Sequence, residues 1–136
     1  MQIQALVFMS VVNCTKLFLC FGALAGAAGV IAGAIGAHLL LPHLSESMAA
    51  AYDTATYYLL LHALALMITG ALLQSNPAKR WLQAAGFAFA LGIVLFSGAL
   101  LVRAGADIAW ISVVAPYGGM LLIGAWLALA IGALTL

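Results

Sequence analysis

Four long apolar stretches, separated by short polar segments, make up most of this chain. Formally charged residues mark the ends of these stretches, and in chain order they are Lys16, Glu46, Asp53, Lys79, Arg80, Arg103 and Asp107. A helix of about 20 residues crosses the ~30 Å hydrocarbon core of a bilayer, and each stretch is at least that long. Because a charge at the centre of a bilayer is costly, charges collect where the chain meets water. The pattern predicts an all-α integral membrane protein, a bundle of four transmembrane helices.

Residues that start and stop helices place the four spans at about 17–41, 54–73, 78–102 and 116–136. Pro42 is expected to end the first span, because the residue before a proline disfavours helical geometry. Ser45 is expected to cap the second helix, whose first two turns then lie at the membrane surface. Asn76 as the cap, with Pro77 in the first position, is expected to start the third helix. One transmembrane domain thus covers 16–136.

An apolar N-terminal extension over 1–15 precedes the first span and has several interpretations. It is too short to cross a bilayer on its own, so a partner protein could cover it. The chain could instead start at Met9, which would remove most of the extension. For the first span itself, the alternative is a cleaved signal peptide with its cleavage site in the small residues at 33–37, but the apolar run after Lys16 is longer than such segments usually are.

The distribution of charge predicts that both termini lie in the cytoplasm. Four spans place Lys16, Lys79 and Arg80 on one side of the membrane and only Arg103 on the other, and the more basic side is usually cytoplasmic. A chain with 68% hydrophobic and 5% charged residues could not cover a soluble core with polar groups. It has no basic run, so no nucleic-acid partner is expected. Its two cysteines stand outside metal-binding spacings, so no metal or other cofactor is expected.

A ladder of glycines lines one face of the first span. Small residues let transmembrane helices approach closely, which supplies much of the packing energy in lipid. The ladder is therefore expected to contact another helix, in the same chain or in a second copy. Its members follow a 4-3-4-3 spacing and are Gly22, Gly26, Gly29, Gly33 and Gly36.

His62 is the ionisable side chain that lies well inside a span, and such residues are candidates for function. Tyr58 precedes it by one turn, while His38 and Ser97 are expected at similar depth in the outer half of the bilayer. We expect these four residues to form a polar cluster in which His62 lies within hydrogen-bond or water-bridge reach of a polar group from another helix. The cluster could shuttle a proton, hold a lipid or quinone head group, or bind a metal. The alternative is interhelical hydrogen bonding without any ligand.

Several short motifs resemble those of the small membrane proteins known as domain of unknown function 423, the YgdD- and YwdK-like family. This family is related to the eukaryotic transmembrane protein 256 group. The resemblance implies four membrane helices and a bacterial inner-membrane location, but no activity. Leu59, Leu101 and Ala115 depart from it, because the family often has glutamine, tyrosine and threonine there. The matching segments are GAIGAH at 33–38, YxxxHALAL at 58–66, LFSG at 95–98, Trp110 followed by PxGG at 116–119, and GxW at 124–126.

Without an aqueous domain or a catalytic set, the sequence favours a protein that is not an enzyme. The first interpretation is an accessory or scaffolding subunit of a larger inner-membrane assembly, such as a respiratory or other redox complex. A small oligomeric transporter or channel is the second, although only Thr69 and Gln83 offer polar groups in the inner half of the spans. A lipid- or quinone-binding protein that uses the polar cluster is the third. The expected partners are membrane lipids, with further membrane subunits or copies of the chain.

Overall fold

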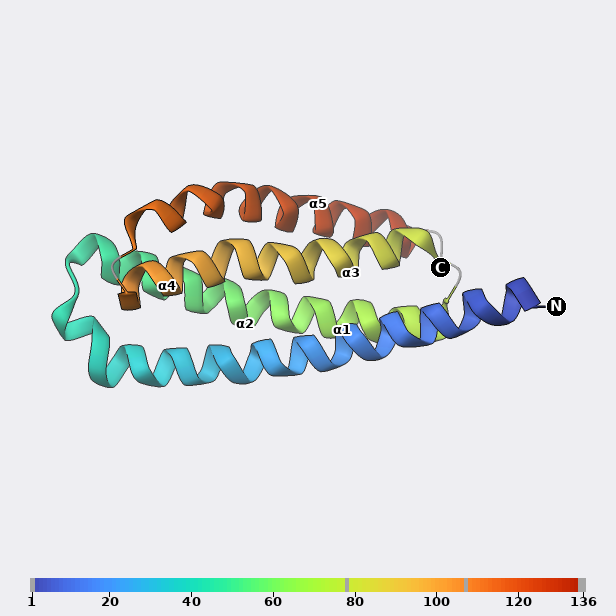
Figure 1. Cartoon of the computed structure of the whole chain (residues 1–136), viewed down its shortest axis with the longest axis horizontal. Coiled ribbons are helices and arrows are strands. Elements are labelled where there is room, and N and C mark those ends of the chain that lie inside the picture. The colour runs from blue at the N-terminus through green and yellow to red at the C-terminus, as the bar shows by residue number, and fades with distance from the viewer. Residues whose placement is uncertain (1, 78, 107, 135–136) are drawn as a thin grey trace.

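Helices form almost all of the chain in the computed structural model, which describes residues 2–77, 79–106 and 108–134 (Figure 1). Three short turns of π or 3-10 helix extend or interrupt the longer α-helices, and one 3-10 turn precedes the last of them. In chain order the elements are α1 (Gln2–Ile35), η1 (Gly36–Leu40), η2 (Leu41–His43), α2 (Glu46–Ser75), α3 (Arg80–Ile93), η3 (Val94–Gly98), α4 (Ala99–Ala106), η4 (Ala109–Val114) and α5 (Ala115–Leu134).

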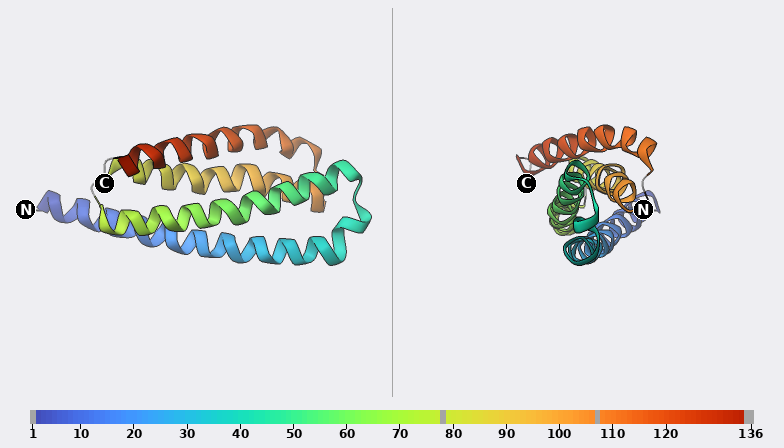
Figure 2. Two further views of the ribbon diagram at one scale, coloured as in Figure 1. Left: turned by 180° about the vertical axis from the view of Figure 1, so that it is seen from behind. Right: turned by 90° about the vertical axis from the view of Figure 1, so that its left-hand side faces the viewer.

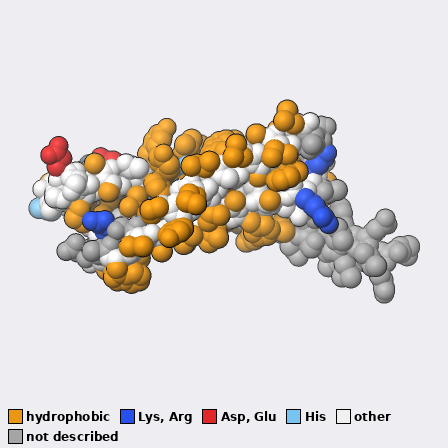
Figure 3. All heavy atoms as spheres, turned by 90° about the horizontal axis from the view of Figure 1, so that it is seen from above, with side chains coloured by type: hydrophobic (Ala, Val, Ile, Leu, Met, Phe, Trp, Pro, Cys, Tyr) orange, Lys and Arg blue, Asp and Glu red, His pale blue; other side chains and the backbone are white. Residues whose placement is uncertain are grey.

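The prediction of four membrane-crossing helices is confirmed. Four helical segments are long and apolar enough to cross a membrane, and they cover 14–43, 46–75, 80–106 and 115–134. The start of α1 and the described end of α5 lie at the same end of the bundle (Figure 1). Hydrophobic side chains cover the middle of the visible face, and charged side chains gather at its two ends (Figure 3). The protein is therefore built as a transmembrane bundle.

The two central helical segments are α2 and the run from α3 through η3 to α4. α1 packs along α2, α5 packs along α3 and η3, and α2 lies beside α3 (Figure 2). As a result α2 and α3 are the more buried segments, whereas α1 and α5 each turn a broad apolar face outward. The core lies between the four helices and includes Phe18, Leu66, Leu82 and Phe89, each of which is fully buried.

All five ladder glycines of α1 and η1 face α2 of the same chain. A Cβ added to Gly26 would lie 3.9 Å from the Cβ of Ala63, and one added to Gly33 would lie 3.7 Å from Cγ2 of Thr56. One added to Gly22 would come within 2.9 Å of the backbone oxygen of Ala63. The contacts at Gly26 and Gly33 are ordinary, whereas at Gly22 only a residue without a side chain lets the two backbones approach this closely.

Glycines also bring α5 against the central helices. A Cβ on Gly118 would overlap the backbone of Leu95 and Phe96, so α5 rests directly on the π turn η3. A Cβ on Gly132 would lie 2.8 Å from Cδ2 of Leu82 on α3. This backbone-to-backbone contact at Gly118 fixes where the side chains of α5 meet those of α2.

The structure confirms one expected helix cap and corrects another. The side chain of Ser45 accepts a hydrogen bond from the backbone nitrogen of Met48 and caps the start of α2. Asn76, however, does not start the third helix. Its backbone N–H and its Nδ2 both donate to the Leu72 carbonyl, so Asn76 closes the end of α2. α3 begins later, at Arg80, with Lys79 as its cap residue.

The apolar N-terminal extension forms one continuous helix with the first span rather than a separate element. α1 runs without a break from Gln2 to Ile35. Its first turns extend past the ends of the neighbouring helices (Figure 1).

Candidate functional site

His62 lies near the middle of the bundle and is almost completely buried. It is the seventeenth of the 30 residues of α2, and its side chain is 3% exposed. Its Nδ1 lies 2.7 Å from the backbone oxygen of Tyr58, one turn earlier on the same helix. Since a carbonyl oxygen can only accept, Nδ1 carries the proton and donates it. This bond holds the ring in one orientation and one tautomer.

Aromatic rings surround the imidazole from three helices. Its centroid lies 5.3 Å from that of Tyr58, 6.0 Å from that of Phe89 on α3, and 6.2 Å from that of Trp126 on α5. Tyr58 in turn packs against Phe96 of η3, with 4.8 Å between the ring centroids. These separations are typical of favourable aromatic contacts. Among the described residues, Nε2 of His62 has no hydrogen-bond partner.

His62 lines a groove of about 350 Å³ between α2, η3 and α5, which we call the His62 groove. Three of its wall residues, Tyr57, Ile123 and Trp126, have strongly exposed side chains, so the groove opens on the outer surface of the bundle. Because His62 lies near the middle of a membrane-crossing helix, the outer surface around the groove contacts lipid. The groove is lined by Tyr57, Tyr58, Leu61, His62, Phe96, Gly119, Leu122, Ile123 and Trp126.

The expected cluster of His38, Tyr58, His62 and Ser97 forms only in part. Tyr58 and His62 are brought together, but the hydrogen bond of His62 goes to its own helix and not to a polar group of another. His38 lies on η1 and is exposed. Because α1 and α2 are antiparallel with Gly26 beside Ala63, His62 is level with about residue 27. At 1.5 Å per residue, His38 is therefore roughly 16 Å nearer the membrane surface.

Ser97 is fully buried within the π turn η3, and its hydroxyl has no hydrogen-bond partner in the described part of the chain. The Thr56 hydroxyl on α2 is buried in the same way. Thr69, by contrast, donates to the Ala65 carbonyl at 2.8 Å. Ser97 follows Phe96 of the groove wall in the sequence, but it is not among the residues that line the groove.

The sequence did not single out the aromatic and small residues that shape the groove. Phe96, Gly119 and Trp126 belong to the LFSG, PxGG and GxW segments, so these motifs contained the signal. Their convergence depends on how α5 rests on η3, which no single-helix pattern reveals.

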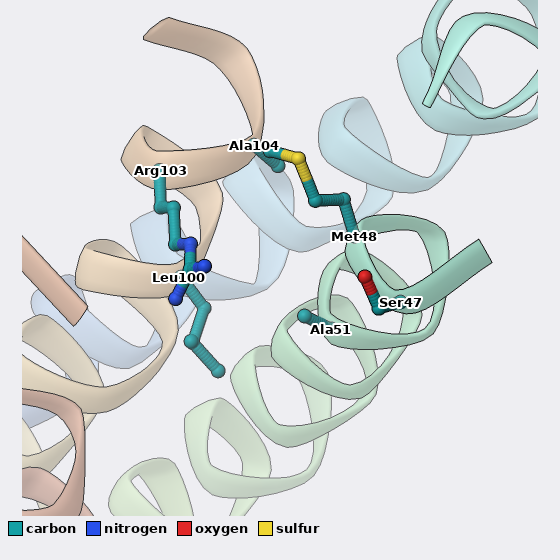
Figure 4. Close-up of a pocket in the computed structure, with 6 residues that line it drawn as sticks. All are labelled: Ser47, Met48, Ala51, Leu100, Arg103 and Ala104. Atoms are coloured by element: carbon teal, nitrogen blue, oxygen red, sulfur yellow. The ribbon is translucent and has the colours of Figure 1, made fainter. Parts of the chain in front are cut away.

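A second hollow lies at the end of the bundle where α2 begins (Figure 4). It has a volume of about 220 Å³, with Ser47, Met48 and Ala51 on one side and Leu100, Arg103 and Ala104 on the other. The guanidinium of Arg103 and the hydroxyl of Ser47 lie on opposite sides of this space (Figure 4). The hydroxyl of Ser47 lies 3.3 Å from that of Ser45, and the remaining lining is mainly apolar.

A third groove, between α1 and the α3–α4 segment, is almost wholly apolar. It has a volume of about 380 Å³, and its lining includes Phe21, Leu59 and Ile93. No His, Lys, Arg, Asp or Glu belongs to this lining among the described residues. This third groove is chemically similar to the rest of the lipid-facing surface. The His62 groove differs from it because its lining contains a histidine.

Comparison with known proteins places this architecture in a family. Residues 32–119 match the family model described as a protein of unknown function, DUF423. The chain belongs to this family. It is 37% identical to a UPF0382 membrane protein of Staphylococcus haemolyticus over 85% of this chain and 93% of the relative. It is also 30% identical to the UPF0382 membrane protein YwdK of Bacillus subtilis, over 87% of this chain and 96% of the relative.

These relatives agree with the fold of the DUF423 chain described above. They are named as membrane proteins and come from bacteria, and this chain has four helices long and apolar enough to cross a membrane. No solved structure matches the chain. The family therefore supports the membrane architecture.

Proposed function

We propose that this protein binds a lipid-soluble small molecule in the His62 groove. The observation that carries the proposal is a buried histidine with one unpaired nitrogen in an aromatic-lined groove that opens toward lipid. A ligand dissolved in the membrane could enter from the side without crossing water. Pockets for small molecules combine a mainly apolar lining with a few placed polar groups, and they measure ~300–1,000 Å³. The groove has this composition and lies at the lower end of that size range.

A matched pair of glycine substitutions on α5 tests this proposal. A Cβ on Gly119 would lie 3.6 Å from Cδ2 of Phe96, an ordinary contact, so Gly119→Leu is expected to fill the groove without displacing the core. A Cβ on Gly124 would meet no described atom within 4 Å, so Gly124→Leu serves as the control. Mass spectrometry of molecules that co-purify in mild detergent should find a bound compound with the wild type and Gly124→Leu. We expect at least a tenfold loss with Gly119→Leu, and equal retention by all three would contradict the proposal.

A second candidate function is that of a non-enzymatic accessory or scaffolding subunit in a larger inner-membrane assembly. It is supported by the first turns of α1, which extend past the ends of the neighbouring helices and consist mostly of apolar residues (Figure 1). Another membrane-protein chain is the partner that would cover such an apolar segment. Native purification should then yield a co-migrating chain that is lost when residues 2–12 are deleted.

A transporter or channel has less support. Its path would need polar groups along the bundle, whereas the buried polar side chains of the described residues are Thr15, His62, Thr69 and Ser97. Thr69 is already bonded to its own helix. His62 is enclosed by aromatic rings.

We further propose an inner-membrane location with both termini in the cytoplasm. The end of the bundle that carries Lys16, Lys79 and Arg80 would face the cytoplasm, following the positive-inside rule. Single cysteines introduced as Glu46→Cys or Gly105→Cys, in a chain without Cys14 and Cys20, should react with an impermeant reagent from the outside. Ser75→Cys should react only after the membrane is opened. The reverse pattern would show the opposite orientation.

A further inference from the structure

We infer that the His62 groove selects a ligand that donates a hydrogen bond from a ring-bound hydroxyl, such as a phenol or a quinol. Ketones, ethers and quinones, which can only accept, are disfavoured. This inference rests on the proposed binding function and names its ligand class. It follows from three properties of the groove: the tautomer of His62, its charge, and the rings around it.

The tautomer is fixed by the bond within α2. Nδ1 donates to the Tyr58 carbonyl at 2.7 Å, so the proton of a neutral imidazole is already placed on that nitrogen. Nε2 then carries a lone pair and can only accept. It lies on the edge of the ring that points away from this backbone contact. Moving the proton to Nε2 would leave the Tyr58 carbonyl facing a second acceptor.

The surroundings keep the imidazole neutral. The groups in ring contact with His62 are Tyr58 from its own helix, Phe89 from α3 and Trp126 from α5. None of them carries a charge that could pair with an imidazolium. A charge buried without a partner in an apolar region is strongly unfavourable. His62 therefore offers a ligand one acceptor and no donor.

The rings make a ring-bearing ligand a better fit than an acyl chain. Tyr58, Phe96 and Trp126 line the groove, and aromatic pairs gain energy beyond the area they bury. An acyl chain would fill the space but leave Nε2 without a partner. The third groove offers such a chain a purely apolar alternative. The Tyr58 hydroxyl can donate or accept, so it does not distinguish the two ligand classes, and the discrimination depends on Nε2.

A matched pair of probes tests the selection: 4-pentylphenol and its methyl ether, which has a similar shape but no donor. Binding to the full chain in detergent is followed by the fluorescence of Trp126, after Trp81 and Trp110 have been replaced by phenylalanine. One hydrogen bond corresponds to roughly a three- to tenfold difference in affinity. We expect the phenol to bind that much more tightly than the ether to the chain with His62. With His62→Phe, which fills similar space without an acceptor, the two affinities should become equal.

The outcomes separate this inference from the proposed function. If phenol and ether bind the chain with His62 equally well, the groove is a binding site but the selection is wrong. If neither probe binds, the proposed function fails and the inference with it. Should His62→Phe not fold, the comparison of the two probes on the chain with His62 still decides. A ¹⁵N spectrum of that chain gives a second readout, and a proton on Nε2 of His62 would overturn the inference.

Discussion

Replacing Gly118 by leucine is expected to remove most of the folded protein. A Cβ at this position would overlap the backbone of Leu95 and Phe96 in η3, and backbone atoms cannot rotate away as a side chain can. Overpacking a core usually costs ~1–3 kcal/mol of folding stability. Because the atoms in the way belong to the backbone of η3, we expect Gly118→Leu to cost more than that. That is a large share of the ~5–15 kcal/mol by which proteins are stable.

The measurement is the yield of monodisperse protein in size-exclusion chromatography after extraction in mild detergent. Gly124→Leu is the control, because it makes the same chemical change on the same helix where a Cβ would meet no described atom within 4 Å. We expect near-normal yield for Gly124→Leu and little or none for Gly118→Leu. Normal yield from both would mean that α5 does not rest on η3 as described.

Gly22→Leu is expected to have the second largest effect, because it would separate α1 from α2. A Cβ on Gly22 would lie 2.9 Å from the Ala63 backbone oxygen and 2.6 Å from Cγ of Met67. The side chain of Met67 can move, but the backbone of Ala63 cannot. Lipid chains would not recover the lost contacts, since transmembrane helices associate through close packing.

Thermal unfolding in detergent measures this effect, with Ala23→Leu on the exposed face of α1 as the control. We expect a stability loss of about 2–4 kcal/mol for Gly22→Leu, as for other badly packed core changes, and little change for Ala23→Leu. An intact monomer that has lost only its ability to assemble would instead place the glycine ladder between chains.

The transmembrane architecture could be predicted from the sequence because it depends on local composition. A charge inside the bilayer is costly whatever the neighbouring helices are, so the positions of seven charged residues define the spans. The cap at Ser45 was also predictable, since it needs only a side chain three residues before its partner Met48. Asn76 was misassigned because a polar residue between two helices can satisfy either end.

The depth of the polar cluster could not be derived in the same way. Counting from the expected ends of the spans places His38 at the level of His62, whereas the structure places it nearer the membrane surface. The actual level depends on the register between antiparallel helices, which the contacts of Gly26 and Gly33 with α2 determine. His62 itself lies near the middle of α2, which begins at Glu46 as the Ser45 cap predicts.

The His62 groove could not be predicted from the sequence for a different reason. His62 was recognisable as a buried ionisable residue, but its aromatic neighbours come from α3, η3 and α5. The π turn at η3 also shapes the groove wall and was not predicted from the sequence. Such turns are often associated with functional sites. The orientation of the imidazole depends on one hydrogen bond to Tyr58 that only coordinates reveal.

The claim that the His62 groove binds a lipid-soluble ligand is tested most directly by photolabelling in membranes. A photoreactive alkylphenol is added to membranes that contain the protein, and the labelled peptides are mapped by mass spectrometry. The account predicts labels concentrated at 57–62 and 119–126, and competed away by excess 4-pentylphenol. Equal labelling of exposed residues on α1, such as Val30 and Ile31, without competition would contradict it.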